Sequence, residues 1–372
     1  MNRPVRVLWL VKGLGPGGAE RLLVAAAAAH DRQHFEIEVA YLLPWKKHLV
    51  PELEDLGIRC TCLDVRDERG LRWARRLRSM LRAEPVDIVH SHSPYPAAIG
   101  RLVVRTLPSP IRPALVSTEH NPWTTFKLPT RYANALTSRM DAAVFAVSDE
   151  ARASMSKRQR ARTQTLVHGI AVDNIGAMRS ERACVRRELG IDDETMLLGT
   201  VANYHPKKDW PNLLHAIRRL ADRGIAVRVC AVGQGPLEGE VQALQRQLDL
   251  SEIVTLTGYR PDAVRLMAGC DIFVLASKWE GLPVALMEAS ALGLPIVATR
   301  VGGVPEAFRD GVDAVLVESG SPNALADAVT RLIDDPIGRQ QLGDRALARA
   351  CDFDVGRAVA CIEATYRGIL TR

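Results

Sequence analysis

The stretch VRVLWLVKGLGPGGAERLL, residues 5–23, decides the fold class of this chain. It begins with a mostly apolar run, Val5–Val11, of the kind found in buried parallel strands. Four glycines follow, and a helical pattern begins near Gly18. Because Gly13-x-Gly15-x-x-Gly18 matches a dinucleotide fingerprint, the stretch predicts an α/β domain whose loop binds an anion through backbone amides at a helix N-terminus.

A nicotinamide or flavin site also needs an acidic residue at the end of the second strand, where it binds ribose hydroxyls. The predicted second strand ends Tyr41-Leu42-Leu43-Pro44, without an acid. Glu36 and Glu38 fall too early in that strand to reach a ribose. The fingerprint is therefore incomplete for a dinucleotide, and we expect the loop to hold another phosphate.

Apolar runs of strand length alternate with helical patterns through the whole sequence, which predicts parallel sheets with crossover helices. We expect two Rossmann-like, doubly wound domains, residues 1–170 and 171–352, with about six strands each. Ligands bind beyond the carboxyl ends of such strands, so two facing domains would enclose a central cleft. The predicted strands are Val5–Val11, Phe35–Leu42, Ile58–Leu63, Asp87–His90, Ala114–Thr118, Ala143–Ala146, Met196–Val201, Ala226–Val232, Ile253–Leu256, Ile272–Leu275, Ile296–Ala298 and Ala314–Val317.

The 372 residues are enough for two domains with separate cores. No stretch approaches the roughly 20 apolar residues of a membrane helix, and the N-terminus has no signal-peptide pattern. We therefore expect a cytoplasmic protein. No Cys-x-x-Cys occurs, and we expect reduced core residues at all seven cysteines, Cys60, Cys62, Cys184, Cys230, Cys270, Cys351 and Cys361.

Positive charge is concentrated in the first half of the chain. Residues 1–170 carry 26 Lys and Arg against 16 Asp and Glu, whereas the rest carries 23 against 27. In the densest stretch, residues 69–82, the apolar residues at roughly helical spacing are Leu71, Trp73, Leu77, Met80 and Leu81. Two interpretations stay open: a core-packed helix with a solvated basic face, and a face that contacts anionic lipid or an acidic acceptor. Nucleic acid is not an expected partner, since no aromatic residues are interleaved as stacking platforms.

A second informative stretch, SKWEGLPVALMEA at residues 277–289, follows a predicted strand and opens a helix. Glu280 lies in the loop and Glu288 on the helix. Eight residues of helical rise separate them by about 12 Å, which is wider than the roughly 5 to 9.5 Å of hydrolase carboxylate pairs. The two carboxylates suit two hydroxyl clusters of one elongated ligand, such as the ribose and the sugar of a sugar nucleotide.

Through these residues the chain resembles the retaining glycosyltransferases of family 4, which have the GT-B fold of two Rossmann-like domains. The resemblance spans nearly the full length, and its most specific element is the Glu-x7-Glu pattern matched by Glu280 and Glu288. It implies that Glu280, with Gly281 and Leu282, contacts the donor sugar. It further implies that Glu288 holds the ribose hydroxyls.

Three other segments of the second half are similar to donor-binding segments of this family. The pair Gly302-Gly303 leads into a helix and is implied to meet the diphosphate or the sugar. Lys208 matches one of two cations that grip the diphosphate, whereas Asn203 stands where the family has the other, an arginine. Tyr259-Arg260 is implied to lie against the nucleotide base.

The first half resembles the family as well. Gly17-Gly18-Ala19-Glu20-Arg21 is similar to the glycine-rich loop of members that build bacterial surface polysaccharides, which assigns Gly17 and Gly18 to the donor and Glu20 to the acceptor. His120, at a predicted strand end, stands at the position of the active-site histidine that approaches the donor sugar. His168-Gly169 is similar to the hinge before the second domain, where Asn-Gly is usual.

The end of the chain resembles the family's last helix, so residues 353–372 are expected to pack back on the N-terminal, acceptor-binding domain. The implied reaction retains the anomeric configuration, with His120, Glu280 and Lys208 as the catalytic residues. Lys208 and the backbone amides of Gly302-Gly303 and Gly17-Gly18 would meet the charge that grows on the leaving diphosphate. No Asp-x-Asp metal motif occurs where a sugar nucleotide would bind, and we expect no metal, no cofactor and no protein nucleophile.

Three histidines lie at neighbouring strand ends. His90 and His92 share one face of a predicted strand, and His120 ends another. A zinc site, an acceptor-lining role for His90 and His92, and structural hydrogen bonding are the alternatives. Zinc has the least support, since no His-Glu-x-x-His or cysteine partner occurs.

The donor is expected to be a nucleoside diphosphate sugar, with uridine favoured. The expected acceptor is a polyprenyl-linked or other glycan precursor of cell-surface polysaccharide, reached at the inner face of the cytoplasmic membrane through the basic first half. Two alternatives stay open: a soluble small-molecule acceptor, such as an antibiotic or thiol precursor, and a nucleotide-sugar sensor without turnover. Asn203 favours the sensor, whereas the intact Glu280, Glu288, His120 and Lys208 favour catalysis.

Overall fold

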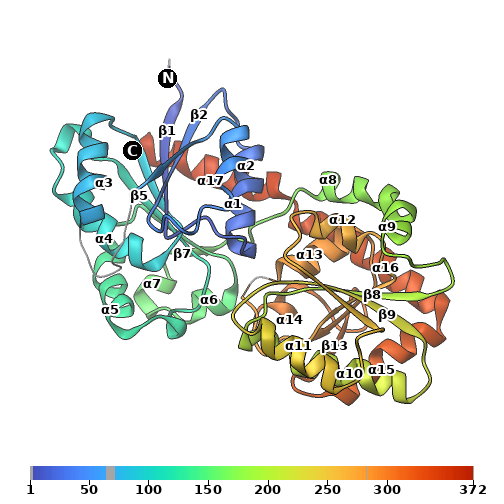
Figure 1. Ribbon diagram of the computed structural model, residues 1–372. Coiled ribbons are helices and arrows are strands. Elements are labelled where there is room, and N and C mark those ends of the chain that lie inside the picture. Colours follow the sequence, from blue (N-terminus) through green and yellow to red (C-terminus); the bar gives the residue numbers. More distant parts are fainter. Residues whose placement is uncertain (1–2, 64–71, 282, 372) are drawn as a thin grey trace. The chain divides into compact units, whose positions relative to one another are not determined.

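The structure, a computed structural model, describes residues 3–63, 72–281 and 283–371. It divides into two compact α/β units, each built around one parallel sheet (Figure 1). The N-terminal unit comprises Met1–Ile170 and Val355–Arg372, and the C-terminal unit comprises Ala171–Asp354. The chain thus leaves the first unit after Ile170 and returns to it at Val355, whose N–H donates to the Ile170 carbonyl over 2.9 Å.

The N-terminal unit has a seven-stranded sheet in the order β3-β2-β1-β4-β5-β6-β7. Its strands are β1 (Val5–Val11), β2 (Phe35–Tyr41), β3 (Arg59–Cys62), β4 (Ile88–Ser91), β5 (Ala114–Glu119), β6 (Ala143–Ala146) and β7 (Thr163–Thr165). Its α-helices are α1 (Gly18–Ala29), α2 (Val50–Asp55), α3 (Arg72–Ala83), α4 (Pro94–Arg105), α5 (Leu128–Thr137), α6 (Asp149–Ala153), α7 (Lys157–Arg160) and α17 (Val355–Leu370). Short 3-10 turns are η1 (Ser109–Ile111), η2 (Trp123–Thr125) and η3 (Ser138–Met140).

Both faces of this sheet are covered, which explains why β1 is apolar at almost every position. Val7, Trp9 and Val11 pack into the core shared with α1 and α17. Leu8 and Leu10, on the other face, pack into the core under α3 and α4. Because successive side chains of β1 point to opposite faces of the sheet, this one strand contributes to both cores.

Helix α17 is fixed to the N-terminal unit by buried polar bonds as well as by apolar packing, and it lies beside α1 (Figure 1). Glu363 accepts from the backbone N–H of Asp31 and lies 2.9 Å from Nδ1 of His30. The Tyr366 hydroxyl lies 2.5 Å from Nδ1 of His90 in β4. These bonds connect the last helix to the first helix and to the middle of the sheet.

The C-terminal unit has a six-stranded sheet in the order β10-β9-β8-β11-β12-β13. Its strands are β8 (Met196–Val201), β9 (Val227–Val232), β10 (Val254–Gly258), β11 (Ile272–Leu275), β12 (Ile296–Thr299) and β13 (Val315–Val317). Its α-helices are α8 (Val172–Ala177), α9 (Arg182–Glu188), α10 (Trp210–Asp222), α11 (Glu238–Gln247), α12 (Ala263–Met267), α13 (Val284–Ala291), α14 (Val304–Ala307), α15 (Pro322–Asp334) and α16 (Pro336–Ala350). Its 3-10 turns are η4 (Met178–Glu181), η5 (Pro206–Lys208) and η6 (Cys351–Phe353).

The prediction of two doubly wound α/β domains is confirmed, and the predicted strands lie within a residue or two of the observed ones. The sequence reading missed β7, because Thr163-Gln164-Thr165 is a short polar strand at the sheet edge. The prediction that every cysteine lies in the core was wrong for Cys184 and Cys351, which are exposed.

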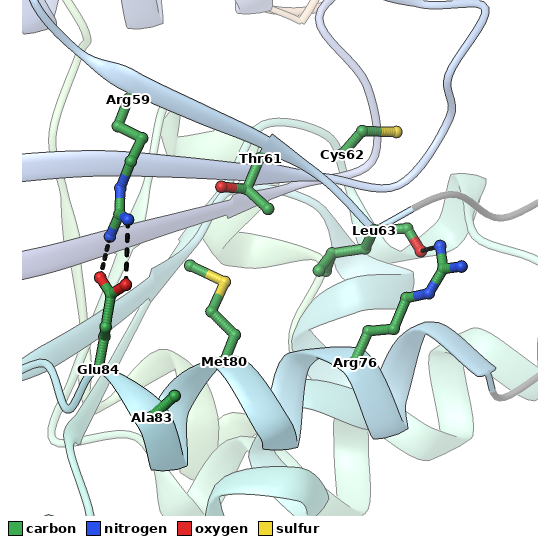
Figure 2. A pocket seen from close by; sticks show the side chains of 8 residues that line it. All are labelled: Arg59, Thr61, Cys62, Leu63, Arg76, Met80, Ala83 and Glu84. Atoms are coloured by element: carbon green, nitrogen blue, oxygen red, sulfur yellow. Dashed lines mark hydrogen bonds and ion pairs between the residues drawn. The ribbon is translucent and has the colours of Figure 1, made fainter.

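Part of the basic stretch 69–82 lies outside the described residues, namely residues 69–71. The rest forms α3, which buries Trp73, Leu77 and Leu81 against the sheet. A pocket of about 330 Å³ lies between α3 and β3. Arg76, one of the lining residues shown in Figure 2, donates to the Leu63 carbonyl over 3.0 Å. Helix α3 is therefore a core-packed helix that also presents a basic outer face.

Candidate functional site

In the C-terminal unit, Lys208 and Glu280 come together although 72 residues separate them. Lys208 ends the loop after β8 and Glu280 lies in the loop after β11, and these strands are neighbours in the sheet. The Lys208 Nζ lies 2.5 Å from Oε1 of Glu280, and the Ser277 hydroxyl donates to the same oxygen over 2.5 Å. Glu280 is only 4% exposed, so this cation and hydroxyl offset the cost of burying its charge.

The two loops are also joined through their backbones. The N–H of Lys278 donates to the Lys207 carbonyl over 2.7 Å. The ammonium of Lys278 lies 3.0 Å from the Asp209 carboxylate. Asp209 adopts the left-handed conformation, with φ at 47°, where the chain turns into α10. The position of Lys208 relative to Glu280 is therefore fixed by several bonds rather than by one ion pair.

The pair Gly302-Gly303 forms the next wall of this site. Gly302 has a φ of +49°, and a Cβ there would collide with the carbonyl of Glu280. A Cβ on Gly303 would collide with the carbonyl of Gly281. The glycines thus let the segment 280–281 lie directly on the turn that leads into α14.

In the N-terminal unit, the carboxyl edge of the sheet carries four histidines: His90, His92, His120 and His168. Ring centroids lie 4.1 Å apart for His90 and His92, and 5.8 Å apart for His92 and His120. His168 closes the group at 5.2 Å from His120 and 6.4 Å from His92. Both ring nitrogens of His92, and Nε2 of His120 and of His168, are buried and have no hydrogen-bond partner among the residues that the structure describes.

Family comparisons account for both units. The family model Glycosyl transferases group 1 matches residues 181–349, and the model Glycosyltransferase Family 4 matches residues 16–174. The chain belongs to the family 4, group 1 glycosyltransferases.

Relatives and structures agree with this family. EpsF of Bacillus subtilis (strain 168) is 28% identical over 325 residues, which cover 84% of this chain and 82% of EpsF. Alpha-D-kanosaminyltransferase of Streptomyces kanamyceticus is 28% identical over 81% of this chain and 82% of its own length. The crystal structure of Anabaena Alr3699/HepE with UDP and glucose has a TM-score of 0.84 at 22% identity, and covers 98% of this chain and 100% of that one. The protein is a glycosyltransferase enzyme with the GT-B fold.

In this glycosyltransferase one of the backbone N–H groups expected to bind the diphosphate forms a hydrogen bond within the protein. The Gly303 N–H donates to the Glu280 carbonyl over 3.0 Å, because the segment 280–281 packs on the glycine turn. The prediction that both glycine amides face the diphosphate is therefore wrong for Gly303. Gly302 is half-buried beside it.

The remaining donor-side residues lie around this centre. Glu288 is half-buried on α13, and Gly281 is half-buried in the loop before it. Leu282 lies outside the described residues. Asn203 is exposed after β8, and its carbonyl accepts from Nε1 of Trp210 over 3.1 Å. The loss of an arginine there leaves Lys208 as the basic residue that the geometry brings to Glu280.

Arg260 is held by two carboxylates of its own unit. Its guanidinium binds Asp262 at 2.7 and 2.8 Å and Glu188 at 3.0 Å. These hydrogen bonds raise its pKa and satisfy its charge within the C-terminal unit. Its hydrogen bonds thus go to Glu188, which ends α9, and to Asp262, which precedes α12. The neighbouring Tyr259 is 40% exposed.

The glycine loop of the N-terminal unit lies against a carboxylate of its own helix. Gly17 is the N-cap of α1, and Gly18 is its first residue. The Glu20 carboxylate lies so close to Gly17 that a Cβ there would collide with it. The Glu20 carboxylate therefore lies in the first turn of α1, beside the positive end of that helix.

His90 is a structural residue rather than an acceptor-lining one. It is fully buried, and its ring nitrogens lie 2.5 Å from the Tyr366 hydroxyl and 2.8 Å from the Thr118 hydroxyl. Of the alternatives left open for His90, the structure therefore fits structural hydrogen bonding and not acceptor lining, since β4 continues past it to Ser91. His92 follows the strand and keeps both nitrogens unpartnered.

Sequence reasoning missed two titratable residues here. His168 was assigned to a hinge, because the strand β7 that brings it to the sheet edge was not recognised. Glu119, the last residue of β5, is 2% exposed. Burial raises its pKa to about 7, against an ordinary value of 4.5.

The histidine cluster is neutral at physiological pH. Burial lowers the pKa of His120 to about 3, with a smaller contribution from His168, and lowers the pKa of His168 to about 4. The pKa values of His90 and His92 also lie well below 6.5, for the same reason. Neutral imidazoles offer one donor and one acceptor each, which suits hydroxyl groups of a sugar.

Two further observations concern the described residues alone. Within residues 3–63, 72–281 and 283–371, no group of three or more His, Cys, Asp and Glu side chains is arranged to hold a metal ion. None of the helices in these ranges has the length and apolar character required to span a bilayer. The geometry thus adds no support to the zinc alternative.

Proposed function

We propose that this glycosyltransferase moves a sugar from a uridine diphosphate sugar to a glycan or polyprenyl-linked acceptor in cell-surface polysaccharide synthesis. The reaction retains the anomeric configuration and takes place in the cytoplasm, at the inner face of the membrane. The observation that carries the proposal is the pairing of Lys208 with the buried Glu280. The Anabaena protein described above was crystallised with UDP and glucose, and this supports the uridine donor.

The Lys208–Glu280 pair is suited to a donor that carries both phosphate and hydroxyl groups. In the absence of donor, each charge neutralises the other at 2.5 Å. A bound diphosphate would attract the ammonium and leave the carboxylate free to accept a hydrogen bond from a sugar hydroxyl. The attraction between the Lys208 ammonium and the diphosphate becomes stronger as charge grows on the leaving diphosphate. Lys208 therefore stabilises the leaving group without a metal or cofactor.

The other roles rest on the resemblance to the family. Glu288 on α13 holds the ribose hydroxyls, and Tyr259 lies against the base. Neutral His120 donates to a hydroxyl of the donor sugar, with its unpartnered Nε2 as the available atom. The acceptor hydroxyl attacks on the side of the leaving group and passes its proton to a phosphate oxygen, so no protein nucleophile takes part.

A second candidate acceptor is a soluble small molecule. It is favoured by the similarity to alpha-D-kanosaminyltransferase, which extends over 81% of this chain. The two candidates share the donor site and differ only in the acceptor. A nucleotide-sugar sensor would share the donor site too but would release no nucleoside diphosphate.

Incubation with radiolabelled UDP-sugars, with a lipid extract or with soluble acceptors, tests these alternatives. We expect UDP release that depends on the lipid extract and is lost in Glu280→Gln. Glu240→Gln, an exposed carboxylate on α11, is the matched control and should keep full activity. Release with soluble acceptors alone would favour the second candidate, and donor binding without release under any condition would favour the sensor.

A further inference from the structure

Helix α5 presents a row of large apolar side chains to solvent. Leu128, Tyr132 and Leu136 are 63%, 66% and 68% exposed. Their spacing of four residues places them on one face of the helix. Leu102, on the adjacent helix α4, is 50% exposed. Exposed apolar residues usually occur singly, and a contiguous group indicates a binding surface.

The outward orientation of this row is fixed by the buried side of α5. The Arg101 guanidinium donates to Oδ1 of Asn134 over 2.7 Å and to Thr137 over 3.2 Å. It also forms a buried ion pair with Asp141 at 2.7 Å. Because these bonds fix the rotation of α5, the row faces solvent as part of a well-packed unit.

The surface around the row is positively charged. Between Ile88 and Ser148 the sequence contains only two acidic residues, Glu119 and Asp141, and both are buried. The exposed basic residues of the same range are Arg105, Arg112, Lys127, Arg131 and Arg139. Helix α7 adds Lys157, Arg158 and Arg160 next to α5, where Gln159 donates to the Ala135 carbonyl over 3.0 Å. The apolar row is thus surrounded by basic side chains, and residues 88–148 contain no exposed carboxylate.

A pocket of about 580 Å³ lies near the C-terminal end of α5. The guanidinium-bearing residues Arg105, Arg112 and Arg139 line it, together with apolar residues such as Val104 and Met140. None of its lining residues is acidic. Guanidinium groups bind phosphate through paired hydrogen bonds, so this pocket fits an anionic headgroup.

We propose that Leu102, Leu128, Tyr132 and Leu136, together with the arginine pocket, form a docking surface for an anionic phospholipid bilayer. The apolar side chains enter the boundary between headgroups and acyl chains, and the surrounding cations bind lipid phosphates. Two copies of so basic a surface would repel each other, which disfavours a self-interface. The inference deepens the proposed function by assigning its membrane contact to one surface.

Flotation of the full chain with vesicles tests the surface. We expect binding to phosphatidylglycerol-containing vesicles and none to pure phosphatidylcholine. The triple variant Leu128→Ser, Tyr132→Ser, Leu136→Ser should reduce the bound fraction by about tenfold or more, and Arg131→Glu with Arg139→Glu should do the same at low salt. Ile337→Ser, at a 73% exposed site on α16, is the matched control and should bind as the unaltered protein does.

UDP binding in the absence of vesicles is measured on the same variants, and it should be unchanged. The docking surface would be overturned if the unaltered chain does not float with vesicles, or if the triple variant floats equally well. Because UDP binding is measured separately, such a result would leave the proposed donor site standing. A dimer that the triple variant dissociates, with no flotation, would overturn it in favour of a self-interface. Flotation without UDP binding would sustain the surface and refute the proposed donor.

Discussion

His168 should make the N-terminal unit sensitive to acid. The residue is 3% exposed, and burial lowers its pKa to about 4 from 6.5. The folded state therefore binds a proton less readily than the unfolded chain does. Because the folded pKa is the lower one, this residue costs no stability above pH 6.5, and the cost grows as the pH falls from 6.5 towards 4.

The size of the effect follows from the two pKa values. At pH 5 the unfolded chain gains about 2 kcal/mol from protonating this one side chain, and at pH 7.5 the gain is close to zero. His168→Asn removes the titration while keeping a polar side chain. The difference in unfolding free energy between pH 7.5 and pH 5 should therefore be about 2 kcal/mol smaller in the variant than in the unaltered protein.

Hydrogen exchange at the two pH values, followed in peptides from β4 and β5, reports on the N-terminal unit specifically. His48→Gln, at an exposed position in the same unit, is the control and should leave the pH dependence as it is. Equal pH dependence in His168→Asn and in the unaltered protein would refute the assignment of a buried, neutral histidine at this position.

Three further substitutions test other parts of the structure. Gly302→Ala should lower the unfolding free energy of the C-terminal unit by about 1 to 3 kcal/mol, since φ is positive there, and should weaken UDP binding; calorimetry that shows neither change would contradict the packing of segment 280–281 on this turn. Tyr366→Phe leaves Nδ1 of the buried His90 unpartnered and should cost about 1 to 3 kcal/mol, measured as faster hydrogen exchange in α17; unchanged exchange would exclude the bond as an anchor. The pKa of Glu119 is about 7 in the folded state, against 4.5 in the unfolded chain. The stability that protonated Glu119 contributes to the folded state is therefore present below pH 4.5 and is lost as the pH rises through 7. Glu119→Gln should therefore gain up to about 3 kcal/mol at pH 8 relative to pH 4 in denaturant titrations, and parallel pH profiles would argue against it.

Much of the fold could be predicted from local sequence. Strands such as β1 and β11 are short apolar runs bounded by turn residues, and the helices between them have clear patterns. Strand β7 escaped because its three residues are polar and its stability comes from pairing with β6. A strand of that kind is defined by its neighbour rather than by its own composition.

Candidate site residues could be named from the sequence, mainly through the family resemblance of the Glu280–Glu288 pattern and of Gly302-Gly303. Glu280 and Lys208 could each be named, but their ion pair depends on β8 and β11 being adjacent, which no local pattern reveals. The need for glycine at Gly303 was foreseen for a ligand, whereas the structure uses its amide for the Glu280 carbonyl.

Residues whose chemistry depends on distant partners or on burial could not be foreseen. Arg260 looked available for a ligand until α9 and α12 supplied Glu188 and Asp262. His168 lay in a segment without a clear pattern, and its proximity to His120 arises only when β7 joins the sheet. The lowered pKa of His168 reflects the desolvation that the complete unit imposes, whereas the raised pKa of Arg260 reflects its hydrogen bonds to carboxylates.

Titration calorimetry of UDP tests most directly whether the Lys208–Glu280 centre holds the donor diphosphate. The unaltered glycosyltransferase should bind UDP, and Lys208→Met should weaken the affinity roughly 10- to 100-fold, as loss of a charge-assisted bond to phosphate requires. Lys157→Met, on α7 of the other unit, should bind like the unaltered protein. Equal UDP affinity in Lys208→Met would contradict the assignment of this centre to the diphosphate.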